Sequence, residues 1–148
     1  EKDDSILEEL DNYAEKIGIK QLVVNLGYKQ LGPELFDIYK KADIYVMPTK
    51  YDAFGRTLWE AMAHSLPIVT TKVGSIPLQL TDGLNAVLVD PGDSKALTIG
   101  INKVANNKEL RQQLIREGRE LVSQNTLEIQ NKKMINELEN YINKKLVK

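Results

Sequence analysis

The sequence has no cysteine and one histidine, His64. The lack of cysteine excludes a disulfide framework, a thiolate zinc site and a cysteine nucleophile, and it fits a reducing compartment such as the cytoplasm. A single imidazole cannot build a multi-histidine metal centre, so chemistry that needs two imidazoles is also excluded. We interpret His64, which falls at the end of a predicted helix, as a structural residue.

The sequence also lacks a charge excess and a long apolar run. Its 20 basic and 21 acidic side chains leave a net charge of −1, whereas a dedicated nucleic-acid binder needs a basic surplus. No stretch of about 18 apolar residues is present, so no transmembrane segment is predicted, and the charged opening EKDDS is not a signal peptide. We expect a cytoplasmic protein without a nucleic-acid partner, and membrane association of the full-length protein stays open.

Apolar spacing predicts how the 148 residues are organised. Short apolar runs without alternation, separated by helices, are typical of strands buried on both faces of a parallel sheet. The predicted fold is therefore a Rossmann-like, doubly wound α/β domain over 1–148, with the sheet in 1–93 and C-terminal helices in 94–148. The predicted strands are 21–26, 43–49, 67–71 and 85–90. The predicted helices are 5–17, with Ser5 and Glu8 as a capping box, and 33–42, 57–65, 75–81, 94–105, 108–122 and 127–146.

In such sheets a ligand binds beyond the carboxyl ends of the strands. The turns at that edge are 25–32, 48–57 and 70–77, and each contains glycine and leads into a helix whose N-terminus can hold an anion. None of the three carries the GxGxxG fingerprint or a Walker A loop.

The second turn holds the most chemical groups. Asp52 and Glu60 are eight positions apart, with the amides of Gly55, Arg56 and Thr57 between them, an arrangement suited to a ligand that carries both hydroxyls and phosphates. Two local roles compete with this interpretation. Thr57 and Glu60 fit a capping box, and Asp52 could satisfy loop amides. Arg56 at a helix start opposes the macrodipole unless an anion is near, which favours the ligand.

The stretch ADIYVMPTKYDAFGRTLWEAMAHSLPIVTTKVGSIPLQLTDGLNAVLVDPGDSKAL, residues 42–97, resembles the donor-binding half of the family-4 (group 1) retaining glycosyltransferases. That family's pattern runs from ADVFVxPS through E-x7-E and EAMAxGxPVV to VGGIPE, DGxNG and PGD, and the segment before it resembles 27–43. The resemblance implies the GT-B fold, in which two Rossmann-like domains face a cleft. This chain matches most of the C-terminal domain, truncated at its start, with extra C-terminal helices.

The resemblance implies site residues as well. Glu60 matches the glutamate that accepts hydrogen bonds from the ribose hydroxyls of the nucleotide sugar, and Asp52 matches the one at the donor hexose. These two are the catalytic candidates. The remaining donor-binding candidates form three groups. The residues that match the stretch along the diphosphate and sugar are Phe54, Gly55, Arg56 and Thr57, and those that match the base-binding segment are Gly27, Tyr28 and Lys29. Gly74 falls in the glycine turn after the third predicted strand.

The implied reaction is metal-independent transfer of a hexose, with retention, from a nucleoside diphosphate sugar to a glycan, lipid or small-molecule acceptor, as in polysaccharide biosynthesis. No cofactor and no metal site is expected, and the sequence has no D-x-D cluster. An alternative is a non-catalytic nucleotide- or partner-binding module on the same scaffold. It rests on departures from the family pattern, namely Asp52 for glutamate, Ser65, Ser75 and Ala86 for glycines, and Leu78 for glutamate.

The family's N-terminal acceptor domain, and the basic residues that neutralise its leaving diphosphate, match no part of this sequence. We therefore expect an acceptor domain of the same protein as the partner and an inactive isolated fragment. Trp59 is interpreted as a core or interface aromatic. An apolar stripe on the last helix is expected to pack against this domain or the missing one: Leu127, Met134, Leu138, Tyr141 and Ile142.

Overall fold

A computed structural model describes residues 2–146, which form two compact units that divide between Leu35 and Phe36. The first unit contains helix α1 (Lys2–Lys16), a 3-10 turn η1 (Lys20–Leu22) and the start of α2 (Pro33–Lys41). Helix α1 already includes Lys2, so Ser5 lies inside the helix. The predicted capping box of Ser5 and Glu8 is wrong for that reason.

The predicted strand over 21–26 is also wrong. The η1 turn takes up the first two residues, and the following segment has no ladder partner among the described residues, although Val23 has extended dihedral angles. Leu22 and Val24 are each 75% exposed. A short apolar run gives the same sequence signal whether or not a neighbouring strand is there to accept its hydrogen bonds, which explains the error.

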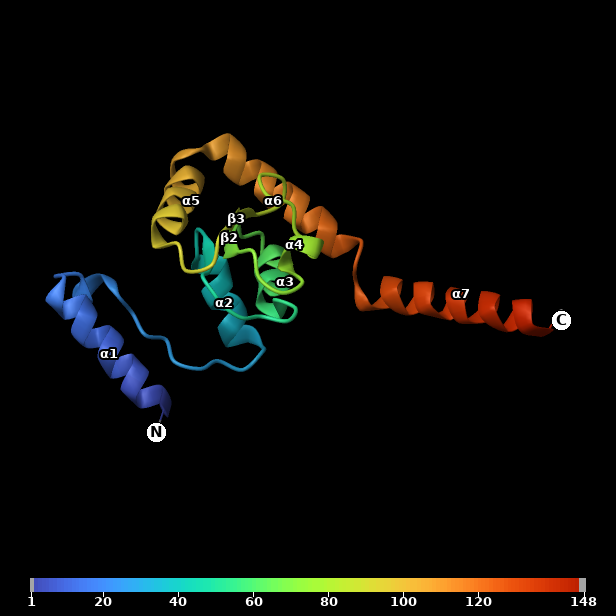
Figure 1. Cartoon of the computed structure of the whole chain (residues 1–148), viewed down its shortest axis with the longest axis horizontal. Coiled ribbons are helices and arrows are strands. Elements are labelled where there is room, and N and C mark those ends of the chain that lie inside the picture. Colours follow the sequence, from blue (N-terminus) through green and yellow to red (C-terminus); the bar gives the residue numbers. More distant parts are fainter. Residues whose placement is uncertain (1, 147–148) are drawn as a thin grey trace. The chain divides into compact units, whose positions relative to one another are not determined.

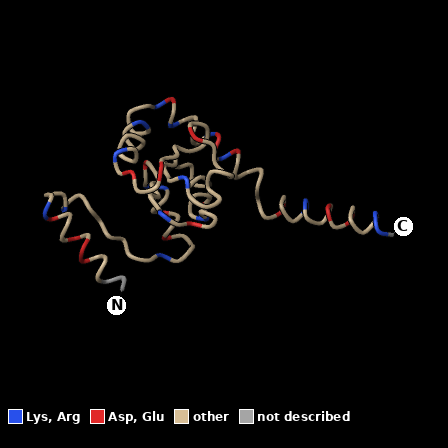
Figure 2. The backbone as a smooth tube through the Cα atoms, in the orientation of Figure 1, with Lys and Arg blue, Asp and Glu red and all other residues tan. Residues whose placement is uncertain are grey.

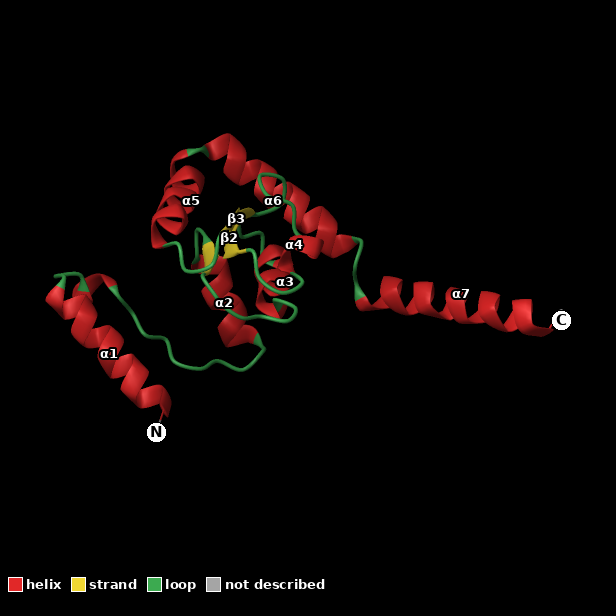
Figure 3. Ribbon diagram, viewed as in Figure 1, coloured by secondary structure: helices red, strands yellow, loops and turns green. Residues whose placement is uncertain are grey.

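The second unit contains a parallel three-stranded sheet of β1 (Tyr45–Met47), β2 (Ile68–Thr71) and β3 (Val87–Val89). The strand order is β1-β2-β3, with Val46 opposite Val69 and Thr70 opposite Leu88. Every residue of β2 and β3 is buried, as the uninterrupted apolar runs predicted. Figure 1 and Figure 3 show the short strands enclosed by helices, which confirms the Rossmann-like α/β class.

One helix follows each strand and two more helices follow α5 (Ser94–Asn106), all at nearly the predicted positions. They are α3 (Arg56–Ala63), α4 (Ile76–Gln79), α5 (Ser94–Asn106), α6 (Lys108–Ser123) and α7 (Leu127–Leu146). The core between the sheet and the helices α5 and α6 is a set of buried aliphatic side chains: Val69, Val87, Val89, Val104 and Leu114.

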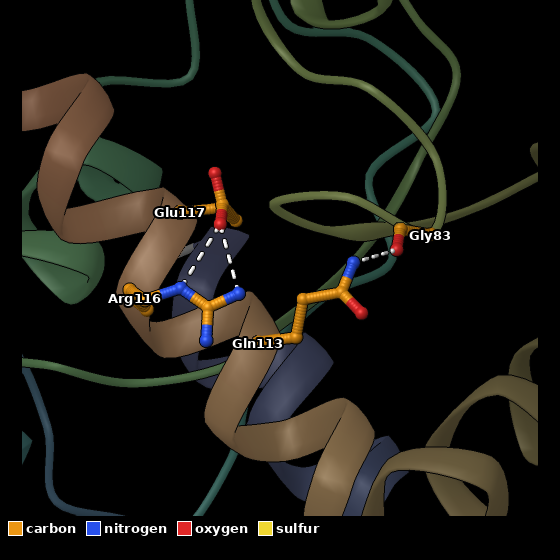
Figure 4. A network of polar contacts seen from close by, with 4 residues as sticks. All are labelled: Gly83, Gln113, Arg116 and Glu117. Carbon is orange, nitrogen blue, oxygen red and sulfur yellow. Dashed lines mark hydrogen bonds and ion pairs between the residues drawn. The ribbon is translucent and has the colours of Figure 1, made fainter.

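Side-chain caps set the starts of α5 and α6. Asp93 accepts from the amide of Ala96 and Asn107 from that of Leu110, at 2.8 and 2.9 Å. From α6, Gln113 donates to the carbonyl of Gly83 at 2.8 Å and so fixes the loop before β3, as Figure 4 shows beside the Arg116–Glu117 ion pair.

Helix α7 carries the predicted apolar stripe, but the stripe is exposed. Leu127 is 74% exposed and Tyr141 58%, so packing against this domain is not seen among the described residues. Packing against a further domain stays a prediction. Figure 2 shows both signs of charge along α6 and α7. Within residues 2–146 no helix combines the length and apolarity needed to cross a membrane.

Candidate functional site

Three loops meet at the carboxyl edge of the sheet, because the strands are parallel. The loop over 48–55 joins β1 to α3, that over 72–75 joins β2 to α4, and that over 90–93 joins β3 to α5. The predicted residues of the second unit lie on the first two of these loops and on α3, which brings them to the edge where such sheets bind ligands.

Asp52 organises the first loop. Its Oδ1 accepts from the amide of Phe54 at 2.8 Å and from that of Gly55 at 2.5 Å. The local role that the sequence left open for Asp52 is therefore present, and the amides of Phe54 and Gly55 are engaged within the loop. No hydrogen bond to Oδ2 from the described residues is present, so this oxygen is the one available to a ligand.

Helix α3 (Arg56–Ala63), which follows this loop, does not begin with the capping box of Thr57 and Glu60. Gly55 is the N-cap, with φ +68° and no side-chain bond, and a β-carbon there would come 2.7 Å from Leu58 Cδ1. Thr57 is thus the second helical residue, and its hydroxyl contacts the sulfur of Met47 at 3.4 Å. Because the N-cap is Gly55, two residues before the Thr57 that the box requires, Glu60 has no capping role.

The α3 N-terminus leaves two backbone donors available. Among the described residues no acceptor pairs with the amide of Arg56 or Thr57, whereas the amide of Leu58 donates to the carbonyl of Gly55 at 2.9 Å. Unpaired amides at a helix start, together with the macrodipole, favour an anion such as phosphate.

Glu60 lies in the second turn of α3 and is half-buried. Its Oε2 accepts from the hydroxyl of Tyr39 at 3.1 Å. Burial raises the pKa of Tyr39 well above its usual range, and Tyr45 and the bond to Glu60 act in the same direction. Sequence reasoning missed Tyr39, since nothing in the local pattern links a residue on α2 to one 21 positions later.

A second tyrosine, Tyr45, is affected by the charges of both carboxylates. Burial is the main cause that raises the pKa of Tyr45, and the negative charges of Glu60 and Asp52 raise it further, while a hydrogen bond with Thr57 lowers it. Tyr45, at the start of β1, is therefore within electrostatic range of both carboxylates. Within residues 5–145, whose side chains the structure describes, no three acidic or histidine side chains are grouped so as to hold a metal ion.

Hydrogen bonds from the end of β2 and from Ser75 hold the first loop in place. The hydroxyl of Thr71 donates to the carbonyl of Thr49 at 2.5 Å, and that of Ser75 to the carbonyl of Ala53 at 2.6 Å. Gly74, between them, has φ +53° and lies so close to the Asp52 carbonyl that only glycine fits. Ser75, a departure from the family pattern, thus stabilises the loop.

Trp59 and Gln79 extend this network. The indole of Trp59 donates to Gln79 Oε1 at 2.8 Å, and Gln79 Nε2 donates to the hydroxyl of Ser75 at 2.5 Å and to the carbonyl of Phe54 at 3.3 Å. The Phe54 ring is nearly parallel to the indole, at 9° and 6.4 Å. Trp59 is half-buried, as expected for a packing aromatic.

His64 has a structural position. It caps the end of α3, where its Nδ1 lies 2.8 Å from the carbonyl of Glu60, and its ring is near those of Phe36 and Tyr39, at 4.9 and 5.1 Å. These contacts agree with the structural interpretation.

The predicted base-binding residues lie in the first unit. Gly27 donates its amide to Asn25 Oδ1 at 2.9 Å, Tyr28 is 89% exposed, and half-buried Lys29 pairs with Glu34 at 2.8 Å. Their role in binding a base stays a prediction.

Comparisons with known proteins identify the family and the fold. The model of the family "Glycosyl transferases group 1" matches residues 5–121. Mannosylfructose-phosphate synthase of Agrobacterium fabrum is 33% identical over 118 residues, which are 80% of this chain and 26% of that protein. Sucrose-phosphate synthase of Zea mays is 40% identical over 88 residues, 58% of this chain and 8% of its own length.

Solved structures share the fold. The C-terminal domain of the group 1 glycosyl transferase LpcC from Francisella tularensis has a TM-score of 0.73 at 25% identity, covering 80% of this chain and 61% of that one. Anabaena Alr3699/HepE in complex with UDP has a TM-score of 0.78 at 25% identity, covering 90% of this chain and 36% of that one. This chain spans about a quarter of the length of mannosylfructose-phosphate synthase. Since the family model covers most of its residues, the chain belongs to the group 1 glycosyl transferase family.

Proposed function

We propose that this chain is the C-terminal, donor-binding part of a family-4 retaining GT-B glycosyltransferase. In this proposal the complete protein transfers a hexose from a nucleoside diphosphate sugar to a glycan, lipid or small-molecule acceptor without a metal ion. An acceptor-binding domain on the same polypeptide is the partner that such a reaction requires. The lack of cysteine supports a cytoplasmic location.

One observation carries the proposal: two unpaired amides and a carboxylate lie on the same short helix at the ligand-binding edge of the sheet. The amides of Arg56 and Thr57 can donate to the diphosphate, and Glu60, one turn further, can accept from the ribose hydroxyls. Donors fixed in advance at a leaving group stabilise its developing charge without reorganisation, and in many enzymes this effect contributes more to the rate than any other. The solved complex of Alr3699/HepE with UDP supports a nucleotide at this fold.

Asp52 is assigned to the hexose in this proposal. Its Oδ1 is engaged by loop amides, so only Oδ2 can accept from a sugar hydroxyl. The same hydrogen bonds also favour the second candidate, a non-catalytic nucleotide-binding module. A carboxylate that stabilises the loop has a structural role, so its presence does not require a bound sugar. The two candidates differ in whether the Asp52 charge affects binding of the sugar.

Calorimetric titration of the 148-residue chain distinguishes them. We expect one of UDP, GDP and ADP to bind, with the same affinity in the presence of EDTA. For the base that binds, Asp52→Asn weakens the affinity for the diphosphate sugar and leaves that for the bare diphosphate unchanged. Equal effects on both ligands favour the non-catalytic module. No binding by any of the three diphosphates contradicts the donor-binding proposal and the nucleotide-binding form of the module, and favours its partner-binding form.

A further inference from the structure

A buried tyrosine contacts the carboxylate on which the proposed site depends. Tyr39 is 6% exposed, and its hydroxyl donates to Glu60 Oε2 at 3.1 Å from helix α2, a different element. No described residue donates to Oε1 of Glu60, so one carboxylate oxygen is engaged by Tyr39 and the other accepts no hydrogen bond from the described residues.

The ring of Tyr39 is itself fixed. It stacks on His64 with centroids 5.1 Å apart at 24°, and lies 5.9 Å from the ring of Tyr45. His64 Nδ1 in turn lies 2.8 Å from the backbone carbonyl of Glu60. The tyrosine therefore contacts the side chain of the same glutamate whose backbone carbonyl lies beside His64, and the Tyr39 hydrogen bond restricts the Glu60 rotamers before any ligand arrives.

We infer that Tyr39 is a positioning residue for ribose recognition by Glu60. The inference rests on the proposed function, in which Glu60 accepts from the ribose hydroxyls. A glutamate side chain loses rotamer freedom when it binds, and a contact that holds it beforehand reduces that cost. The hydroxyl stays a donor at neutral pH, since a buried phenol beside a carboxylate does not ionise there.

The test compares ribonucleoside diphosphates with their 2′,3′-dideoxy analogues. UDP, GDP and ADP, each with its analogue, are titrated into the 148-residue chain and into Glu60→Gln, Tyr39→Phe and Tyr141→Phe. The measured quantity is the ratio of affinities, ribose over dideoxyribose, for the base that binds. Tyr141→Phe removes a hydroxyl from the exposed part of α7 and serves as the matched control. Circular dichroism and the Tm of each variant show that it is folded.

We expect the wild-type chain to prefer the ribose form by about tenfold or more, and Glu60→Gln to remove most of that preference. Tyr39→Phe, which keeps the ring, should lower the ratio by about threefold to tenfold and leave the dideoxy affinity unchanged. A purely structural role for Tyr39 predicts equal losses for both ligands, because a displaced loop affects the diphosphate as well.

The outcomes separate the inference from the proposed function. A wild-type ratio near one, or no binding by any of the six ligands, overturns the proposed role of Glu60 and the inference with it. A large wild-type ratio that Glu60→Gln lowers and Tyr39→Phe leaves unchanged overturns the inference alone. A Tyr39→Phe chain that does not fold assigns Tyr39 to the core and likewise overturns the inference.

Discussion

Gly74 lies directly against the backbone of Asp52, so closely that a β-carbon at position 74 overlaps the Asp52 carbonyl oxygen. The same glycine has φ +53°, where residues with a side chain are strained. The two loops of the site can therefore approach each other only because position 74 has no side chain.

Replacing Gly74 by alanine tests this close approach. We expect Gly74→Ala to lower the free energy of unfolding by at least about 2 kcal/mol, from left-handed strain together with the clash. Gly92→Ala is the matched control, because Gly92 also has a positive φ, +80°, but nothing within 4 Å of its added β-carbon. Urea unfolding measures the free energy of unfolding of both variants. Equal losses in the two variants would show that the loops move apart at no cost.

Two substitutions at Asp52 separate its charge from its hydrogen bonds. Asparagine keeps an oxygen that accepts from the amides of Phe54 and Gly55, and alanine removes it. We expect Asp52→Ala to destabilise the chain by about 1–2 kcal/mol and Asp52→Asn by much less, as for helix caps. Thermal unfolding of the two variants checks this, and a loss in Asp52→Asn as large as that in Asp52→Ala contradicts it.

Ser65 occupies a position that favours glycine. Its φ is +65°, and the amides of Ser65 and Leu66 donate to the carbonyls of Met62 and Ala61, the two bonds of a Schellman motif after α3. Ser65→Gly should therefore raise the free energy of unfolding by about 0.5–1 kcal/mol. Glycine relieves the strain of the left-handed conformation, and the greater conformational entropy of glycine in the unfolded chain offsets part of that gain. A Tm lower than that of the wild type argues against this assignment.

The two shifted tyrosines predict how stability depends on pH. The pKa values of Tyr39 and Tyr45 are raised in the folded chain, whereas a tyrosine in the unfolded chain ionises near pH 10. Above about pH 10 the unfolded state therefore loses phenol protons that the folded state retains. The free energy of unfolding should fall with rising pH, by up to about 1.4 kcal/mol per pH unit for each phenol. In Tyr39→Phe the fall should be shallower between about pH 9 and 11, and the same slope as in the wild type contradicts the prediction.

Much of the fold could be predicted from local patterns. Uninterrupted apolar runs indicated the strands β1 to β3, and helical spacing of apolar residues indicated the helices to within about three residues at each end. The run over 21–26 could not be assigned correctly, because a strand exists only with a partner and the sequence does not state which runs pair. The N-terminus of α3 was misplaced by one residue, since Gly55, not a hydroxyl side chain, precedes it.

The site was predictable only in part, because some of its contacts join residues that are distant in the sequence. The resemblance and the spacing indicated Asp52, Glu60 and the amides between them, all within one loop and helix. The contact of Tyr39 with Glu60 and the bond from Ser75 to Ala53 join residues 21 and 22 positions apart. Such contacts depend on how α2 and α4 pack on α3, and no local pattern encodes them.

The central claim is that the start of α3 binds a nucleoside diphosphate. Amide chemical shifts in a ¹⁵N-labelled chain, followed during titration with UDP, GDP or ADP, test it most directly. The account predicts that the amides of Arg56 and Thr57 shift among the most with one of the three, and that Glu60→Gln lowers the affinity about tenfold. Shifts confined to other parts of the chain, with an affinity that Glu60→Gln does not change, would contradict it.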